Sequence, residues 1–210
     1  MVFGGAFLGL KHMERNYWNH NAAYHPWLRR IIVKTRADSV LDVGCGDGYL
    51  LAAVAPRLER AVGVDVDSSS VDTARVRCAD MQHVEFYVGD FLTTTFDSTF
   101  DVIVFSASIH HMNFEAALRK ARSLLNPGGT IAVIGLARNN TLLDYLWDGI
   151  WLPIVRLSSV VHREIDVPPA PIVAPRMSLG EIKQTALNIL PGAHIRRGLY
   201  YRYLLNWRNV

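Results

Sequence analysis

Short apolar runs alternate with helix-like segments along the middle of the chain. Five runs have the length and the β-branched content of buried strands; they span residues 39–43, 60–66, 84–88, 100–106 and 129–137. Three segments between them have a helical pattern; they span residues 48–59, 69–79 and 113–125. Apolar strands separated by helices are typical of a parallel sheet covered on both faces. The pattern therefore predicts a doubly wound α/β fold.

The pattern changes after residue 137. Residues 138–177 contain five of the nine prolines and are interpreted as an irregular insertion that forms a lid. A helix is predicted over residues 178–190. Residues 193–207 are interpreted as two final strands joined by a tight turn.

The N-terminal region has a helical pattern over residues 13–24. Pro26 is expected to break this helix, because the residue before a proline, here His25, disfavours the helical conformation. Residues 1–12 are apolar but lack the charge pattern and the cleavage site of a signal peptide, so they are interpreted as a loose extension. Charged residues and a proline interrupt the apolar stretch 142–161, and no stable membrane span is expected there.

Composition narrows the class of protein. The 210 residues are 50% hydrophobic and 20% charged, which is typical of one ordered domain. Only two cysteines are present, which favours a reducing, cytoplasmic setting. The net charge is +3 and no run of five basic residues occurs, so a nucleic-acid partner is not expected.

The most specific motif is VLDVGCGDGYL at residues 40–50, where the first strand turns into the first helix. Gly44, Gly46 and Gly48 allow a tight turn and the close approach of a ligand. A dinucleotide fingerprint needs a third glycine five positions after the first, and neither register provides one. Asp42 stands two residues before the first glycine. The pattern G-x-G-x-G preceded by an acid differs from the fingerprint of the nicotinamide enzymes.

With this motif, the chain resembles the class I S-adenosylmethionine-dependent methyltransferases. Three further segments match that family in order: GVDVD with Asp65, YVGDF with Asp90 and Phe91, and LLNPGGTIAVIGL at residues 124–136. The resemblance covers residues 38–137 well and the remainder loosely. It implies a seven-stranded, mostly parallel sheet with an antiparallel C-terminal strand.

The resemblance also implies S-adenosylmethionine as the cofactor and S-adenosylhomocysteine as the product, without a metal. Asp65 would accept the ribose hydroxyls, Asp90 would bind the adenine amino group and Phe91 would pack near the ring. Taken alone, Asp65 could be a helix-capping or turn residue, although Asp67 and Ser68 would cap the helix equally well. Taken alone, Asp90 could be a turn residue. Cys45 is interpreted as a small loop residue. The predicted cofactor site comprises Asp42, Gly44, Cys45, Gly46, Gly48, Asp65, Val66, Asp90, Phe91 and Ser106.

The stretch SASIHHMN at residues 106–113 follows the fourth strand, where the resemblance places the methyl donor. It lacks the prolines of enzymes that methylate amino groups of nucleic acids, and it lacks the acidic ligands of metal-dependent O-methyltransferases. It resembles instead the small-molecule group that includes the ubiquinone and menaquinone methyltransferases. A small-molecule acceptor is therefore expected. The protein itself is expected to be a monomer or a homodimer.

The N-terminal segment YWNHNAAYHPW adds candidate acceptor contacts. In this family the region before the sheet covers the cofactor, so residues 1–37 are expected to form a helical cap on a domain spanning residues 38–210. On a helix, His20 and Tyr24 would share a face, and Asn21 and His25 would form a neighbouring pair. Asn21, Tyr24, His25 and His110 are the predicted substrate residues.

His111 and His20 are the candidate catalytic residues, as general bases for an acceptor that must lose a proton. One alternative is that one histidine of the pair His110–His111 caps the next helix or contacts the cofactor while the other packs. Another is that both histidines only pack. Two functions stay open: a methyltransferase, or a non-catalytic S-adenosylmethionine-binding subunit that regulates a partner.

Overall fold

The computed structural model describes residues 22–140, 174–198 and 201–209. The predicted site residues His20 and Asn21, the N-terminal extension and most of the predicted lid lie outside the described residues. Within them, no helix is long and apolar enough to span a membrane.

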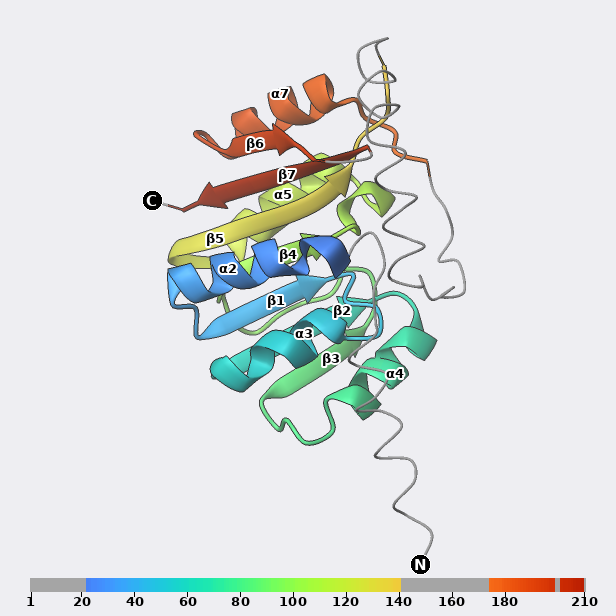
Figure 1. Ribbon diagram of the computed structural model, residues 1–210, viewed down its shortest axis with the longest axis vertical. Coiled ribbons are helices and arrows are strands. Elements are labelled where there is room, and N and C mark those ends of the chain that lie inside the picture. The colour runs from blue at the N-terminus through green and yellow to red at the C-terminus, as the bar shows by residue number, and fades with distance from the viewer. Residues whose placement is uncertain (1–21, 141–173, 199–200, 210) are drawn as a thin grey trace, which may run out of the picture.

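The predicted sheet is confirmed, with seven strands in the order β3-β2-β1-β4-β5-β7-β6 (Figure 1). The five parallel strands are β1 (Ser39–Val43), β2 (Arg60–Asp65), β3 (Val84–Val88), β4 (Phe100–Ser106) and β5 (Leu125–Leu136). The strand β7 (Arg202–Arg208) runs antiparallel to both its neighbours, β5 and β6 (His194–Arg197). The order reverses between β1 and β4, which is where α/β sheets bind ligands.

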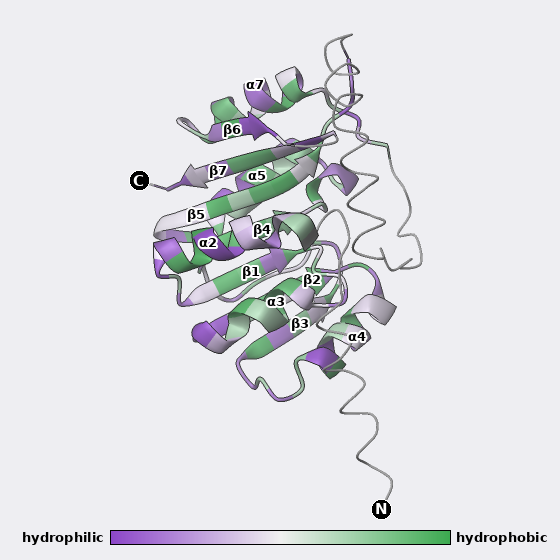
Figure 2. Ribbon diagram, viewed as in Figure 1, coloured by the Kyte–Doolittle hydropathy of each residue, from purple (hydrophilic) through white to green (hydrophobic). Residues whose placement is uncertain are grey.

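Helices cover both faces of the sheet, as the continuous apolar strands require. The helices α2 (His25–Thr35) and α3 (Tyr49–Val54) pack on one face, and α5 (Phe114–Ser123) and α7 (Leu179–Ile189) pack on the other. The helix α4 (Ser68–Arg77) lies beside β2 and β3. Hydrophobic residues concentrate on the central strands and polar residues on the outer sides of the helices (Figure 2).

Local signals in the sequence begin several helices. The Asp67 side chain accepts hydrogen bonds from the backbone N–H groups of Ser69 and Ser70 and caps α4. Ser178 and Glu181 form a reciprocal capping box at the start of α7. Among the described residues, the short 3-10 helix η1 (Ala22–Tyr24) leads into α2, and the 3-10 helices η2 (Ala55–Arg57) and η3 (Ile109–His111) connect longer elements.

The expectation that Pro26 breaks a helix at His25 is wrong. His25 is the first residue of α2, and Pro26 lies in its first turn. A proline there costs no hydrogen bond, because the first N–H groups of a helix have no intrahelical partner. Pro26 therefore starts the helix that packs Leu28 and Ile32 into the core.

The predicted C-terminal hairpin is present and closes one edge of the sheet. Tyr203 on β7 is 1% exposed and lies over Gly135 on β5. A Cβ atom at Gly135 would lie 2.2 Å from the Tyr203 ring, so this position needs a glycine. The Trp207 indole N–H donates to the carbonyl of Pro191, 2.9 Å away, and holds β7 to the turn before β6.

Candidate active site

The three glycines of the loop after β1 all have a positive φ, at 74° for Gly44, 49° for Gly46 and 74° for Gly48. A Cβ atom at Gly44 would lie 2.2 Å from the Cβ of Ser108, and one at Gly48 would lie 2.8 Å from the Cβ of Ala74. At Gly46 the space is open, with nothing within 4 Å. The loop thus packs tightly at its two ends and exposes its middle backbone to a ligand.

The end of β2 holds this loop in place. The N–H of Gly44 donates to the carbonyl of Val64 at 2.8 Å, and the N–H of Gly46 donates to Asp65 Oδ2 at 2.8 Å. Asp65 Oδ1 accepts from the N–H of Asp67 at 3.0 Å. Because Asp67 caps α4, Asp65 does not serve as that cap. Its oxygens have further lone pairs that could accept ribose hydroxyls.

Arg77 on α4 also holds the loop, which the sequence did not predict. Its Nε donates to the carbonyl of Asp47 at 2.7 Å, and its guanidinium carbon lies 3.5 Å from the centroid of the Tyr49 ring. Tyr49 is the first residue of α3, immediately after Gly48. A single cation thus fixes both the loop and the helix that follows it.

Asp42 is a buried acid below the glycine loop. It is 1% exposed, and its Oδ1 has no hydrogen-bond partner among the described residues. Burial, and then the nearby charge of Asp65, raise the pKa of Asp42 to about 7. A buried carboxylate of this kind is stabilised by a cation. The ammonium group of a methionine-type cofactor fits this requirement.

Cys45 is buried beside Phe86 and Gly63. A Cβ atom at Gly63 would lie 2.8 Å from Cys45 Sγ and 2.6 Å from the Phe86 ring, so β2 needs a glycine there. Burial is the largest cause that raises the pKa of the Cys45 thiol. The thiol stays protonated and is a poor nucleophile, since the thiolate is the reactive form.

Val66 and Asp90 flank the Asp65 corner at the ends of β2 and β3. The Val66 side chain is 71% exposed, an unusual degree for valine that leaves it available to an apolar ring. Asp90 Oδ1 accepts from the N–H of Leu92 at 2.8 Å and so forms an Asx-turn. The predicted contact between Asp90 and adenine stays a prediction.

Phe91 lies in the core. It is 2% exposed and makes an edge contact with Phe105, with the ring centroids 5.6 Å apart. Lys120 lies above the same ring at 5.3 Å, and it donates to the carbonyls of Leu92 and Thr94. Phe91 thereby anchors the segment that carries Asp90, and its predicted contact with adenine stays a prediction.

The end of β4 approaches the glycine loop through Ser108. Ser106 is partly buried at the last position of β4 and pairs with Ile134. Ala107 has a positive φ of 57°, and the turn brings Ser108 against Gly44. The hydroxyl of Ser108 donates to the carbonyl of Val43. Ser108 therefore joins β4 to β1 at the site, a role that the sequence analysis missed.

The two histidines of η3 lie ring to ring, with their centroids 4.1 Å apart. His110 is partly buried and its Nδ1 is buried without a hydrogen-bond partner among the described residues, whereas His111 is exposed. Burial, the neighbouring His111 and then Arg202 lower the pKa of His110 to about 4, so His110 is neutral at pH 7. Neither histidine caps the next helix, since Asn113 accepts the hydrogen bond from Ala116 N–H at the start of α5.

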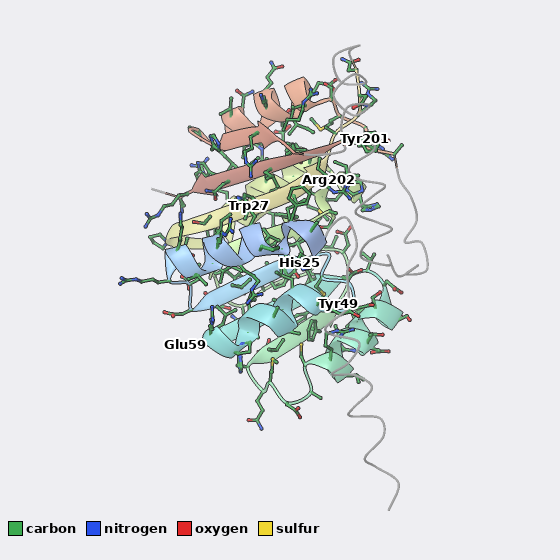
Figure 3. The ribbon with its side chains drawn as sticks, in the orientation of Figure 1. His25, Trp27, Tyr49, Glu59, Tyr201 and Arg202 are labelled. Carbon is green, nitrogen blue, oxygen red and sulfur yellow. The ribbon has the colours of Figure 1, made fainter. Side chains whose placement is uncertain are left out.

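Tyr24 and His25 lie near the same end of the sheet. Burial, and then Arg29, lower the pKa of His25 to about 4. The Tyr24 hydroxyl lies beside Gly198 at the turn between β6 and β7, where Arg202 also lies. His25, Tyr49 and Arg202 are found toward one end of the sheet (Figure 3).

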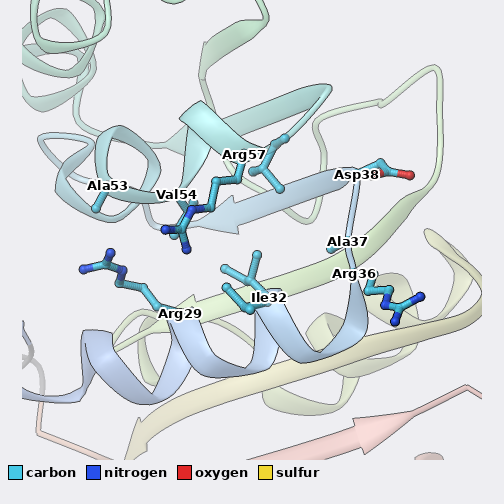
Figure 4. A pocket seen from close by; sticks show the side chains of 10 residues that line it. Arg29, Ile32, Arg36, Ala37, Asp38, Ala53, Val54 and Arg57 are labelled. Atoms are coloured by element: carbon cyan, nitrogen blue, oxygen red, sulfur yellow. The ribbon is translucent and has the colours of Figure 1, made fainter.

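A separate cavity of about 230 Å³ lies between α2 and the end of α3 (Figure 4). Arg29, Arg36 and Arg57 line it above apolar side chains that include Ile32 and Val54. It contains none of the predicted site residues. Among the described residues no group of three or more histidines, cysteines or acids could hold a metal ion.

Comparison with known proteins decides the family. A family model described as a methyltransferase domain matches residues 40–129. An uncharacterized methyltransferase of Mycobacterium tuberculosis is 33% identical over 194 residues, which cover 91% of this chain and 96% of that protein. The chain belongs to the class I S-adenosylmethionine-dependent methyltransferases. This membership confirms S-adenosylmethionine as the cofactor and S-adenosylhomocysteine as the product.

Two further similarities bear on the fold and the subgroup of this methyltransferase. The crystal structure of the N-methyltransferase NodS from Bradyrhizobium japonicum, in complex with S-adenosylhomocysteine, has a TM-score of 0.61 and 16% identity. The match covers 95% of this chain and 97% of that chain, and it shows the fold. A ubiquinone biosynthesis O-methyltransferase of Leptothrix cholodnii is 25% identical over 60% of each protein, which loosely supports the predicted subgroup.

Proposed function

We propose that this methyltransferase is a cytoplasmic enzyme that transfers the methyl group of S-adenosylmethionine to a small-molecule acceptor. The observation that carries the proposal is the juxtaposition of a cofactor cradle and the histidine turn η3. The glycine loop, Asp42 and Asp65 form the cradle, and Ser108 connects it directly to the histidine turn.

The residues of the cradle would hold the cofactor in distinct ways. Asp42 would pair with its ammonium group, Asp65 and Asp90 would accept from the ribose and the adenine, and Val66 would pack against the ring. The bound cofactor supplies an activated methyl group on a sulfonium. The protein then has to orient the acceptor and exclude water, which are its main contributions to an in-line displacement.

The acceptor side is proposed to comprise Tyr24, His25 and His110 with the candidate bases His111 and His20, under a lid formed by residues 138–177. Asn21 is proposed to join them from the cap formed by residues 1–37. His111 acts as a general base where the acceptor must lose a proton. The subgroup similarity supports an acceptor of small-metabolite size.

The test is release of S-adenosylhomocysteine when the purified protein receives S-adenosylmethionine and fractionated metabolite extracts. We expect release with at least one fraction. Tight cofactor binding with no release on any fraction would instead favour the regulatory subunit. The substitution His111→Ala is expected to abolish turnover with unchanged S-adenosylhomocysteine affinity, and a parallel loss of both would place His111 in the cofactor site.

A further inference from the structure

The cavity between α2 and α3 is lined by more positive than negative charge. Arg29 reaches it from α2, Arg36 from the residue after that helix, and Arg57 from the end of η2. Among the described residues that line it, Asp38 is the one acid. Three guanidinium groups against one carboxylate give the cavity a net positive charge, so it favours an anionic ligand.

No acidic partner engages these three guanidinium groups in the part of the chain that the structure describes. None of them donates a hydrogen bond or forms an ion pair there. Figure 4 shows Arg29 and Arg57 reaching from α2 and η2 into the same space, whereas Asp38 points away from both. Two like charges that converge repel each other, and an anion between them replaces this repulsion by attraction.

The cavity also has an apolar floor. Ile32 and Val54 line it, and each of them is only 4% exposed. Its volume of about 230 Å³ is below the roughly 300 Å³ at which pockets for drug-sized ligands begin. The cavity therefore suits a small ligand that carries an apolar group next to its negative charge.

This cavity is separate from the cofactor site. Asp38 immediately precedes β1, and Leu58 lies two residues before β2, so these lining residues are at the amino ends of the two strands. The glycine loop with Gly44 and Gly46 follows the carboxyl end of β1. A ligand in the cavity thus leaves the cofactor site free.

We propose that this cavity binds a small soluble phosphomonoester. Its phosphate is held between Arg29 and Arg57, and its apolar part lies on Ile32 and Val54. A phosphate dianion has three terminal oxygens and accepts from two guanidinium forks at once, whereas the two oxygens of a carboxylate match a single fork. The inference goes beyond the proposed function and does not depend on the identity of the methyl acceptor.

Calorimetric titration of phenyl phosphate into the full-length protein tests the inference. Saturating S-adenosylhomocysteine keeps this probe out of the cofactor site. We expect one phenyl phosphate per chain, with an affinity that falls as the salt concentration rises, because the three arginines are exposed to solvent. Inorganic phosphate, which lacks the apolar part, is expected to bind severalfold more weakly. Phenol, which lacks the phosphate, should give no measurable binding.

Three variants assign the binding to the cavity. Arg29→Met and Arg57→Met each remove one guanidinium and keep an apolar stem, so we expect phenyl phosphate affinity to fall at least about tenfold in each. Arg30→Met is the matched control, because Arg30 is exposed on the same helix but does not line the cavity. It should keep the wild-type affinity. Unchanged S-adenosylhomocysteine binding in all three variants shows that they are folded.

Each part of the inference has its own contrary result. A wild-type protein that does not bind phenyl phosphate overturns the site, and so does binding that Arg30→Met weakens as much as Arg57→Met does. Equal affinities for phenyl phosphate and inorganic phosphate overturn the apolar part. Cosedimentation with phosphatidic acid vesicles that Arg29→Met abolishes, in a protein that does not bind phenyl phosphate, replaces the soluble ligand by an anionic membrane surface. None of these results bears on methyl transfer, so the proposed function is tested separately.

Discussion

At Gly44 a Cβ atom would lie 2.2 Å from the Cβ of Ser108, whereas at Gly46 nothing lies within 4 Å. Both glycines have a positive φ. Gly44→Ala is therefore expected to lower the free energy of unfolding by about 3 kcal/mol or more, through overpacking added to backbone strain. Gly46→Ala is expected to cost only about 1 kcal/mol of strain.

For cofactor binding we expect the opposite order, with Gly46→Ala the more damaging of the two variants. Gly46→Ala puts a methyl group into the open space above the loop, so we expect weaker S-adenosylhomocysteine binding in a protein that is still folded. Denaturant unfolding and calorimetric titration of the two variants check this pair of outcomes. Equal losses of stability would contradict the packing described for Gly44.

Asp42 gives cofactor binding a pH dependence. Its pKa is raised to about 7, and a bound ammonium group favours the ionised form. Below pH 7, binding must therefore release a proton, and the affinity for S-adenosylhomocysteine is expected to fall by up to about tenfold per pH unit. Titrations at pH 6, 7 and 8 measure this.

The matched variant for this effect is Asp42→Asn. It should bind S-adenosylhomocysteine more weakly than the wild type at pH 8, with an affinity that varies little with pH. A wild-type affinity that is the same at pH 6 and pH 8 would show that Asp42 does not pair with the cofactor.

At the scale of elements, Arg77 couples α4 to the glycine loop and to α3. Arg77→Met removes the hydrogen bond to the Asp47 carbonyl and the contact with the Tyr49 ring. We expect about a tenfold weaker affinity for S-adenosylhomocysteine, because the loop must then be ordered at the expense of binding. Arg75→Met on the same helix, which does not contact the loop, is the control. Similar affinities in the two variants would argue against this positioning role.

The sequence predicted those elements whose apolar pattern is continuous. The strands at residues 39–43, 84–88 and 100–106 have the predicted bounds, since each is a short apolar run between polar residues. The helix α2 was not predicted, because the rule for the residue before a proline was applied to His25, where the proline opens a helix. The five-strand core and the hairpin follow from local pattern alone.

The missed site residues all act over long sequence distances. Ser108 bonds to a carbonyl 65 residues away, and Arg77 to one 30 residues away. Neither contact leaves a mark in the local pattern.

For the whole molecule, partly buried neutral histidines make stability depend on pH. The pKa of His110 is lowered from 6.5 to about 4, so the unfolded chain takes up a proton below pH 6.5 that the folded protein refuses until about pH 4. Stability is therefore lost as the pH falls through this window, and regained as it rises. His25 contributes in the same direction.

His110→Gln removes one of these contributions. Between pH 6.5 and pH 4, the variant is expected to lose about 1–2 kcal/mol less unfolding free energy than the wild type. Urea unfolding at several pH values measures the difference. Parallel stability curves for the two proteins would show that His110 is not buried in its neutral form.

The central claim is that the strand ends around the glycine loop hold S-adenosylmethionine. It is tested most directly by calorimetric titration of S-adenosylhomocysteine into the wild type, Asp65→Ala and the control Asp72→Ala, an exposed position on α4. We predict one site per chain, an affinity at least about tenfold weaker in Asp65→Ala, and no change in Asp72→Ala. Wild-type affinity in Asp65→Ala, or no binding by the wild-type protein, would contradict the account.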